Sequence, residues 1–146
     1  MAVKFIEYAA GMNIDEVMAA KDVTRNANAF TDTDDPDILA AYALGVTNGT
    51  GNDGFTPDGE ITREQAATML MNACGVLGMV PDDIPIAEFA DISSVSDWAQ
   101  HGVNFCALYN IMQGTGNDNF SPKATYTREQ SIITFNNIKH NELPGQ

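Results

Sequence analysis

Apolar residues recur at helical spacing after Asp97. Counted from Trp98, further apolar or small residues fall at i+4, i+7, i+8 and i+11, which places them on one face of an α-helix. These residues are Trp98, Gly102, Phe105, Cys106 and Tyr109. Because Asp is a residue type that caps helix N-termini, the pattern predicts an amphipathic helix of about twelve residues with Asp97 as its cap.

A shorter helix is predicted upstream, from Asp37 to Leu44. Pro36 lies just before it and suits a helix start, since its missing N–H would find no helical partner there. Gly45 then ends the helix.

The clearest pattern is an internal repeat. The segment 49–57 reads Gly-Thr-Gly-Asn-Asp-Gly-Phe-Thr-Pro, and Thr-Arg-Glu-Gln follows at 62–65. Sixty-five positions later, 114–122 reads Gly-Thr-Gly-Asn-Asp-Asn-Phe-Ser-Pro, and the same four residues follow at the same distance. A Phe-Xaa-Asp element precedes each copy, at Phe30 and at Phe89. A match without gaps indicates duplication.

Each copy is predicted to be a helix-loop-helix unit. Gly, Asn and Asp in the loop accept positive φ at little cost, so the chain can turn sharply there. Phe55 and Phe120 are expected to anchor the two loops on the core. Thr-Arg-Glu-Gln is typical of a capping box that starts the second helix. One face of that helix carries matching residues in the two copies: Ala67, Leu70 and Ala73 in the first, Ile132, Phe135 and Ile138 in the second.

Residues 1–29 allow two interpretations. The three arginines of the chain, Arg25, Arg63 and Arg128, each follow a Thr, which suggests that 1–29 is a third, degenerate copy. The alternative is a plain pair of helices around Asn13. Either way we expect a single domain over 1–146, with repeats at 30–88 and 89–146.

Length and charge exclude several classes of protein. A chain of 146 residues is about one domain, large enough for a packed core. Seven Lys and Arg against twenty Asp and Glu give a net charge of −13, which argues against binding to nucleic acid or an anionic membrane surface. No apolar run of about 18 residues predicts a membrane span. The N-terminus does not read as a secretion signal, so the protein is cytoplasmic or a leader has been removed.

Together the motifs resemble the S-layer homology (SLH) repeat. The matching positions are Phe89, Asp91, Trp98, Ala99, Gly114, Phe120, Pro122, Thr127, Arg128 and Glu129. With the first copy the resemblance covers about 30–138, and it implies an all-α fold, a pseudo-symmetric bundle of helix-loop-helix repeats. This chain departs from the family pattern in its box, which reads Glu-Gln where Ala-Glu is usual, and in the first copy, which has no Trp.

The resemblance also implies a function. SLH domains anchor exported proteins non-covalently to acidic, often pyruvylated, secondary polysaccharides of bacterial cell walls, which implies an extracellular location at the cell surface. In that family the Arg of the box helps to hold acidic groups in grooves between repeats. A guanidinium at the first turn of a helix is suited to this, because the helix N-terminus also attracts anions.

The ligand-binding residues that we expect from the resemblance are Arg128, Arg63, Trp98 and Arg25. Arg128 is expected to contribute most, because its copy has both the Trp-Ala helix and the full loop, and Arg25 least. The alternative for each Arg is a surface ion pair with its own Glu neighbours.

A second function from another class stays open: a degenerate SLH-type interaction module that binds a protein partner or its own copy. Met69, Met71, Met79 and Met112 would suit an adaptable apolar surface. Grooves lined by Trp and Arg would indicate a glycan, and grooves lined by Met and Leu a protein. The sequence leaves the oligomeric state open.

No catalytic, metal-binding or cofactor motif is found. Asp58-Gly59-Glu60-Ile61 has the local look of a calcium loop, but Gly54 and Thr56 stand where acidic ligands are needed. His101 and Cys106 are five residues apart and lie on different faces of the predicted helix. Cys74 and Cys106 are expected to be small buried hydrophobic residues. The sequence therefore predicts a binding domain and no enzyme.

Overall fold

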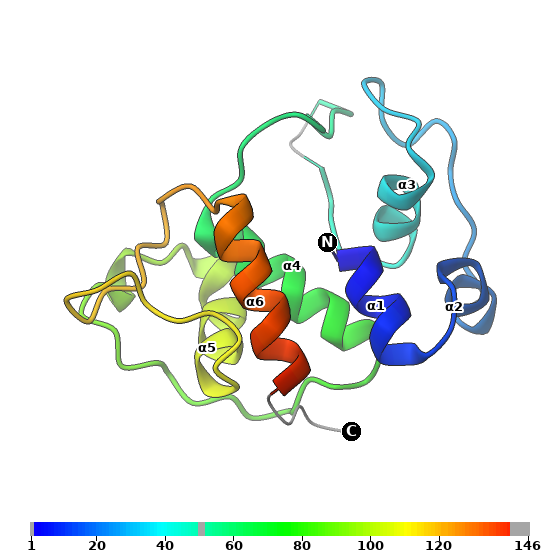
Figure 1. Cartoon of the computed structure of the whole chain (residues 1–146). Coiled ribbons are helices and arrows are strands. Elements are labelled where there is room, and N and C mark those ends of the chain that lie inside the picture. The colour runs from blue at the N-terminus through cyan, green and yellow to red at the C-terminus, as the bar shows by residue number, and fades with distance from the viewer. Residues whose placement is uncertain (1, 50–51, 141–146) are drawn as a thin grey trace. The chain divides into compact units, whose positions relative to one another are not determined.

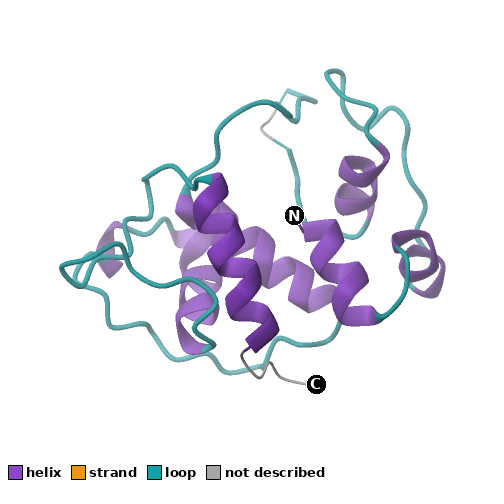
Figure 2. Cartoon of the chain, viewed as in Figure 1, coloured by secondary structure: helices purple, strands orange, loops and turns teal. Residues whose placement is uncertain are grey.

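The computed structural model describes residues 2–49 and 52–140, apart from the side chains of residues 128, 135, 139 and 140. In this part of the chain helices are joined by long loops, as Figure 2 shows. Extended pairing is limited to isolated bridges, of which one joins Thr62 to Thr125. The predicted all-α class is confirmed.

The helices are labelled in Figure 1 in chain order. They are α1 (Ala2–Ala10), α2 (Ile14–Ala20), α3 (Pro36–Ala43), α4 (Arg63–Val76), the 3₁₀ turns η1 (Ile92–Ser94) and η2 (Asp97–Ala99), α5 (Gln100–Leu108) and α6 (Arg128–His140). The chain divides into two compact units, one of Met1–Gly59 with Asn72–Leu77 and one of Glu60–Met71 with Gly78–Gln146. Helix α4 contributes residues to both units.

In the first unit α1, α2 and α3 contact one another. Asn13 caps α2 in a full capping box: its side chain accepts from the Glu16 N–H at 3.0 Å, and the Glu16 carboxylate accepts from the Asn13 N–H at 2.9 Å. The helix pair around Asn13, one of our two expectations for this region, is therefore present. Its origin as a third repeat, like the repeat boundaries, stays a prediction.

Helix α3 begins and ends close to where its sequence predicts. Pro36 is its first residue, and the side chain of Asp35 accepts from two N–H groups of the first turn. After Leu44 the chain leaves the helix at Gly45, whose φ is +79°. The predicted short helix is confirmed, with Asp35 as a cap that the pattern did not identify.

In the second unit α5 packs closely against the first turns of α4. A Cβ on Gly102 would lie 2.8 Å from Thr68 Cα, so only glycine allows this approach. The Sγ of Cys106 lies 3.7 Å from the Ala67 carbonyl. Fully buried side chains of this unit include Leu70, Val103, Phe105, Ile111 and Phe120.

Both cysteines are buried thiols, as predicted. Burial raises the pKa of Cys74, which belongs to the first unit, to about 12. Each fills a place in the core as a small apolar side chain would.

The start of α5 differs from the prediction. Asp97 is not its cap: Ala99 holds the N-cap position of α5, and Asp97 opens the 3₁₀ turn η2, whose own N-cap is Ser96. A 3₁₀ turn has three residues per turn, which shifts its side chains out of register with the α-helix that follows. Trp98 lies in this turn and is 58% exposed, whereas Gly102, Phe105 and Cys106 are buried, so its placement on one helical face with them was wrong.

The buried face of α6 also differs in part. Ile138 is buried, but Ile132 is 57% exposed. The matching residues of α4, Ala67, Leu70 and Ala73, have the same spacing and are all buried, so the spacing alone does not account for the exposure of Ile132. The assignment of Ile132 to that face was wrong.

Both predicted capping boxes form. The Thr62 N–H donates to the Gln65 side chain at 2.8 Å, and the Gln65 N–H donates to the Thr62 hydroxyl at 3.3 Å. In the second copy the same two bonds join Thr127 and Gln130, at 3.2 and 3.1 Å. Helices α4 and α6 therefore start by the same mechanism.

Removing one cap tests this mechanism. Thr127→Ala is expected to lower the free energy of unfolding by about 0.5–2 kcal/mol, because the N–H of Gln130 loses its acceptor. Urea denaturation measures the change. Thr127→Ser keeps the hydroxyl and serves as the control. Equal midpoints for the Ala variant and the wild type would show that the cap contributes nothing.

Candidate binding site

The second loop is held by a carboxylate from the Phe-Xaa-Asp element. The two oxygens of Asp91 accept from the N–H groups of Phe120 and Ser121, each at 2.8 Å. Phe120 is fully buried, and its ring packs against Phe89 with ring centroids 5.3 Å apart. The carboxylate thus fixes the turn, and Phe120 anchors the loop on the core as predicted.

The first loop repeats this arrangement within its own unit. Asp32 accepts from the N–H groups of Phe55 and Thr56 at 2.8 and 2.7 Å, and these two bonds lower the pKa of its carboxyl. The residue after the Phe has positive φ in both copies, 58° at Thr56 and 59° at Ser121. The duplicated sequence therefore gives a duplicated loop conformation.

Arg63, at the start of α4, is buried against the second loop. Its Nε donates to the Phe120 carbonyl at 2.8 Å, and a terminal nitrogen donates to the Gln113 carbonyl. The guanidinium carbon lies 4.8 Å from the centre of the Phe120 ring, within the range of a cation–π interaction. Only 4% of Arg63 is exposed. Burial lowers its pKa, but a guanidinium remains charged in proteins.

Main-chain bonds dock the first box onto the second loop. The N–H groups of Arg63 and Glu64 donate to the carbonyls of Ala124 and Pro122, at 2.9 and 3.0 Å. In return the Tyr126 N–H donates to the Ile61 carbonyl at 2.8 Å. The first N–H groups of a helix have no partner inside the helix, and here the neighbouring loop supplies those partners.

Glu64 is a buried carboxylate in the same contact. It accepts from both the N–H and the hydroxyl of Ser96, each at 2.9 Å, and from the Lys123 ammonium. Its side chain is 3% exposed, whereas that of Lys123 is 60% exposed. Burial alone raises the pKa of Glu64, but the hydrogen bonds from Lys123 and Ser96 outweigh it, and the pKa lies below its ordinary value.

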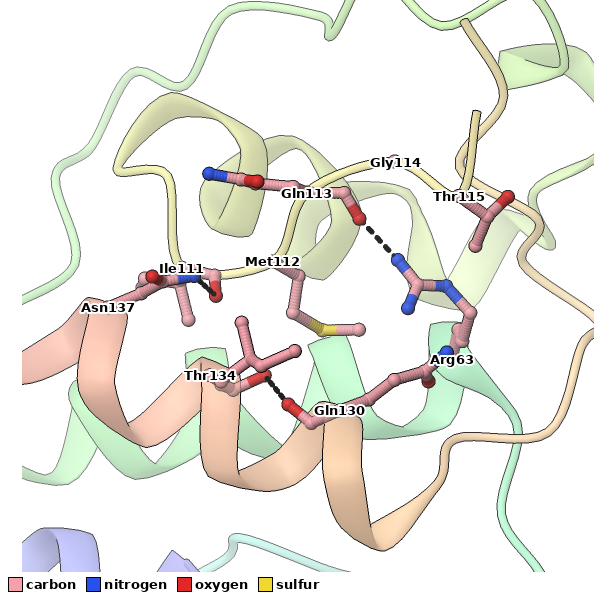
Figure 3. A pocket seen from close by; sticks show the side chains of 10 residues that line it. Arg63, Ile111, Met112, Gln113, Gly114, Thr115, Gln130, Thr134 and Asn137 are labelled. Carbon is pink, nitrogen blue, oxygen red and sulfur yellow. Dashed lines mark hydrogen bonds between the residues drawn. The ribbon is translucent and has the colours of Figure 1, made fainter. Parts of the chain in front are cut away.

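Beside this contact lies a pocket of about 260 Å³. It is lined by Arg63, Ile111, Met112, Gln113, Gly114, Thr115, Gln130, Ile133, Thr134 and Asn137. In Figure 3 the guanidinium of Arg63 lies at one side, with one terminal nitrogen bonded to Gln113 and the other directed into the space. Among these lining residues Arg63 alone carries a charge.

The wall opposite Arg63 is fixed by internal hydrogen bonds. Asn137 donates to the Ile111 carbonyl at 3.2 Å, and the Thr134 hydroxyl donates to the Gln130 carbonyl at 2.9 Å (Figure 3). The Tyr126 hydroxyl lies 2.7 Å from that of Thr134. Amide and hydroxyl groups thus face the pocket from α6 in fixed positions, together with the apolar side chain of Ile133.

The predicted ligand-binding residues are not all placed together. Arg63 lines the pocket, but Trp98 does not. Arg25 belongs to the first unit, where it pairs with Asp15 at 2.6 Å and donates to the Pro36 carbonyl at 2.8 Å. The side chain of Arg128 lies outside the described residues, so its role stays a prediction.

Neither Arg25 nor Arg63 forms the predicted pair with its own Glu neighbours. Arg25 forms an ion pair, but its partner is Asp15. Arg63 does not pair with neighbouring glutamates: carbonyl oxygens hold it, and Glu64 pairs with Lys123 instead.

The sequence analysis missed the polar wall of the pocket. A signal was present, because the spacing of 65 extends beyond the loop. Asn72 donates to the Val46 carbonyl at 3.3 Å in the first unit, just as Asn137 donates to that of Ile111 in the second. Glu64 carries no such signal, since its partner Lys123 aligns with Asp58 in the first copy.

Among the described residues, no group of three or more His, Cys, Asp or Glu side chains is placed to hold a metal ion. None of the described helices is both long and apolar enough to cross a bilayer.

The duplicated loops, clamps and capping boxes match a known family. The S-layer homology domain model matches residues 30–67 and 88–130, more than half of the chain. The chain belongs to this family, whose domain is a binding module. No solved structure is significantly similar to the chain.

Several relatives are surface proteins or large enzymes. An endoglucanase of Bacillus sp. (strain KSM-635) is 38% identical over 105 residues, which are 70% of this chain and 11% of the enzyme. The S-layer protein sap of Bacillus anthracis is 34% identical over 96 residues, 66% of this chain and 11% of that protein. The surface-layer 125 kDa protein of Lysinibacillus sphaericus is 28% identical over 107 residues, 71% of this chain and 9% of that protein.

The chain thus spans about a tenth of the length of these relatives. Family membership and the surface-layer relatives indicate an extracellular protein associated with the bacterial cell wall. They support cell-wall anchoring as the general function.

The lowered pKa of Glu64 predicts an acid-sensitive fold. A carboxyl whose folded pKa lies below its unfolded value of 4.5 stabilises the folded state above that value, and the stabilisation is lost as pH falls through the folded pKa. Glu64→Gln is therefore expected to lose less unfolding free energy than the wild type between about pH 7 and about pH 3. Urea denaturation at both pH values measures this, and equal losses would contradict it.

Proposed function

We propose that this chain anchors an exported protein to the cell wall by binding an acidic secondary cell-wall polysaccharide, with an acidic group of the glycan held in the Arg63 pocket. The observation that carries the proposal is the guanidinium at the pocket wall, fixed by the carbonyls of Gln113 and Phe120. A cation held in this way needs no reordering when it meets a carboxylate. The amide and hydroxyl groups of α6 suit the hydroxyls of a sugar.

The charge distribution supports an anionic ligand at this point. The chain carries −13 overall, so an acidic polymer is repelled at long range. The residues that line the pocket include no carboxylate, so attraction to Arg63 acts at short range without a competing acid in the wall. Because salt screens the long-range repulsion over roughly 10 Å at 0.1 M, association is expected to become faster as moderate salt is added.

The apolar part of the pocket favours a second candidate, a protein partner. Met112 and Ile133 line the pocket together with Arg63, and Trp98 is absent from it. A groove lined by Trp and Arg would indicate a glycan, and a groove lined by Met and Leu would indicate a protein. This pocket combines Arg63 with Met112, so its lining matches neither type alone. A wall-binding measurement decides between the two candidates.

Co-sedimentation with purified Gram-positive cell walls tests the proposed function. The chain is expected to bind intact walls, and to lose most of that binding after acid extraction has removed the secondary polysaccharide. Binding that survives extraction would assign the interaction to another wall component. No binding to intact walls would reject the glycan proposal in favour of a protein partner.

Two neighbouring isoleucines give a matched pair of variants. Ile132 and Ile133 are both 57% exposed on α6, but only Ile133 lines the pocket. Ile133→Glu is expected to weaken wall binding about tenfold or more, because a carboxylate at the pocket repels the acidic group that Arg63 holds. Ile132→Glu adds the same charge outside the pocket and is expected to bind nearly as well as the wild type. Equal loss in both variants would show that total charge matters and the pocket does not.

An arginine series separates the candidate anchors. Arg63→Lys keeps the charge but cannot reproduce the fork of bonds to two carbonyls, and it is expected to weaken wall binding. Arg25→Ala removes an ion pair in the other unit and is expected to have the smallest effect. Arg128→Ala tests the anchor that the resemblance favours, with an expected loss of about ten- to a hundred-fold. Full binding by Arg63→Lys, with loss in Arg128→Ala, would move the site to Arg128.

A further inference from the structure

We infer that Glu64 is a positioning residue: its buried carboxylate fastens the second loop to the start of α4 and so fixes the guanidinium of Arg63 in the pocket wall. The inference rests on the proposed function for its biological importance. The contacts of Glu64 and Arg63 from which it is drawn involve no ligand.

Two main-chain carbonyls hold the guanidinium of Arg63. Its acceptors are the carbonyls of Phe120 and Gln113, both in the second loop region. Phe120 is three residues before Lys123, and Lys123 is the residue that Glu64 holds. The Glu64 carboxylate therefore acts on the same loop segment whose carbonyl orients the neighbouring arginine.

The loop is held from two sides. Asp91 accepts from the N–H groups of Phe120 and Ser121, and this clamp has a counterpart in the first loop at Asp32. The Glu64 contact has no counterpart there, because Asp58 occupies the place of Lys123. Asp91 thus forms the turn, and Glu64 adds its attachment to α4.

Burying the Glu64 carboxylate costs desolvation free energy, which its hydrogen bonds must offset. An unpaired buried carboxylate is strongly unfavourable, but this one has three donors, the N–H and hydroxyl of Ser96 and the Lys123 ammonium. Ser96 is the N-cap residue of η2, so the same carboxylate also ties the start of η2 to the box. The second box has the same sequence, yet its Glu129 is exposed.

The test observes Arg63 directly, by NMR of its Nε–H. That group donates to the Phe120 carbonyl at 2.8 Å, so its exchange with solvent is expected to be slow in the wild type. Loss of the signal in Arg63→Lys assigns the resonance. In Glu64→Gln, exchange at Arg63 is expected to become about tenfold faster. Glu64→Gln also lowers overall stability, so exchange of the Phe105 backbone amide in the core is expected to rise with global unfolding, but by a smaller factor than exchange at Arg63.

Controls separate positioning from general destabilisation. Glu129→Gln removes the same charge at the matching, exposed position and is expected to leave Arg63 exchange unchanged. Lys123→Met keeps Glu64 but removes the cation, and it tests the positioning role if Glu64→Gln does not fold. Lys21→Met removes the same charge from an exposed residue elsewhere and serves as its control. Acceleration of Arg63 and Phe105 by the same factor would indicate a merely structural role and overturn the inference, as would unchanged Arg63 exchange in a folded variant.

The result is independent of wall binding. If the wild type binds no wall but Glu64→Gln releases Arg63, the positioning role stands and the proposed function fails. If the wild type binds walls and Glu64→Gln leaves Arg63 exchange unchanged, the proposed function stands and this inference fails.

Discussion

The pocket depends on one carboxylate that holds two backbone N–H groups. Asp91 fixes the turn at Phe120 and Ser121. That turn buries the Phe120 ring and presents its carbonyl, and both contact the guanidinium of Arg63. Without the turn, Arg63 would lose an acceptor and the ring beneath it, and the pocket would lose its charged side. A structural aspartate thus determines where the guanidinium of Arg63 lies.

Identical sequences take on different roles according to the loop packed against them. Both Thr-Arg-Glu-Gln boxes start a helix with the same pair of hydrogen bonds. In the first box Arg63 and Glu64 are buried, because the second loop supplies carbonyls and a lysine and Ser96 before η2 supplies two further donors. In the second box Glu129 is exposed. The capping box is formed by four consecutive residues, whereas the burial of the Arg and Glu side chains depends on the neighbouring loop.

This distinction explains which features could be predicted from the sequence. The all-α class, α3, the loops and the capping boxes depend on contacts between residues close in the chain or on the 65-residue match, and these predictions are confirmed. Trp98 was misplaced because it lies in a 3₁₀ turn, and Ile132 is exposed although the matching Ala67 is buried. The bond from Arg63 to the Gln113 carbonyl spans fifty residues, and no local pattern encodes it. The sequence indicated which arginines to consider, and only packing showed that Arg63 lines a pocket.

The two buried thiols have a consequence for a protein at the cell surface. Disulfides and sulfur oxidation start from the thiolate. Burial raises the pKa of Cys74 to about 12, so at neutral pH this side chain is a thiol and not the reactive thiolate. The side chain of Cys106 also lies in the core. Buried thiols of this kind are poor targets for oxidation in the medium around the cell.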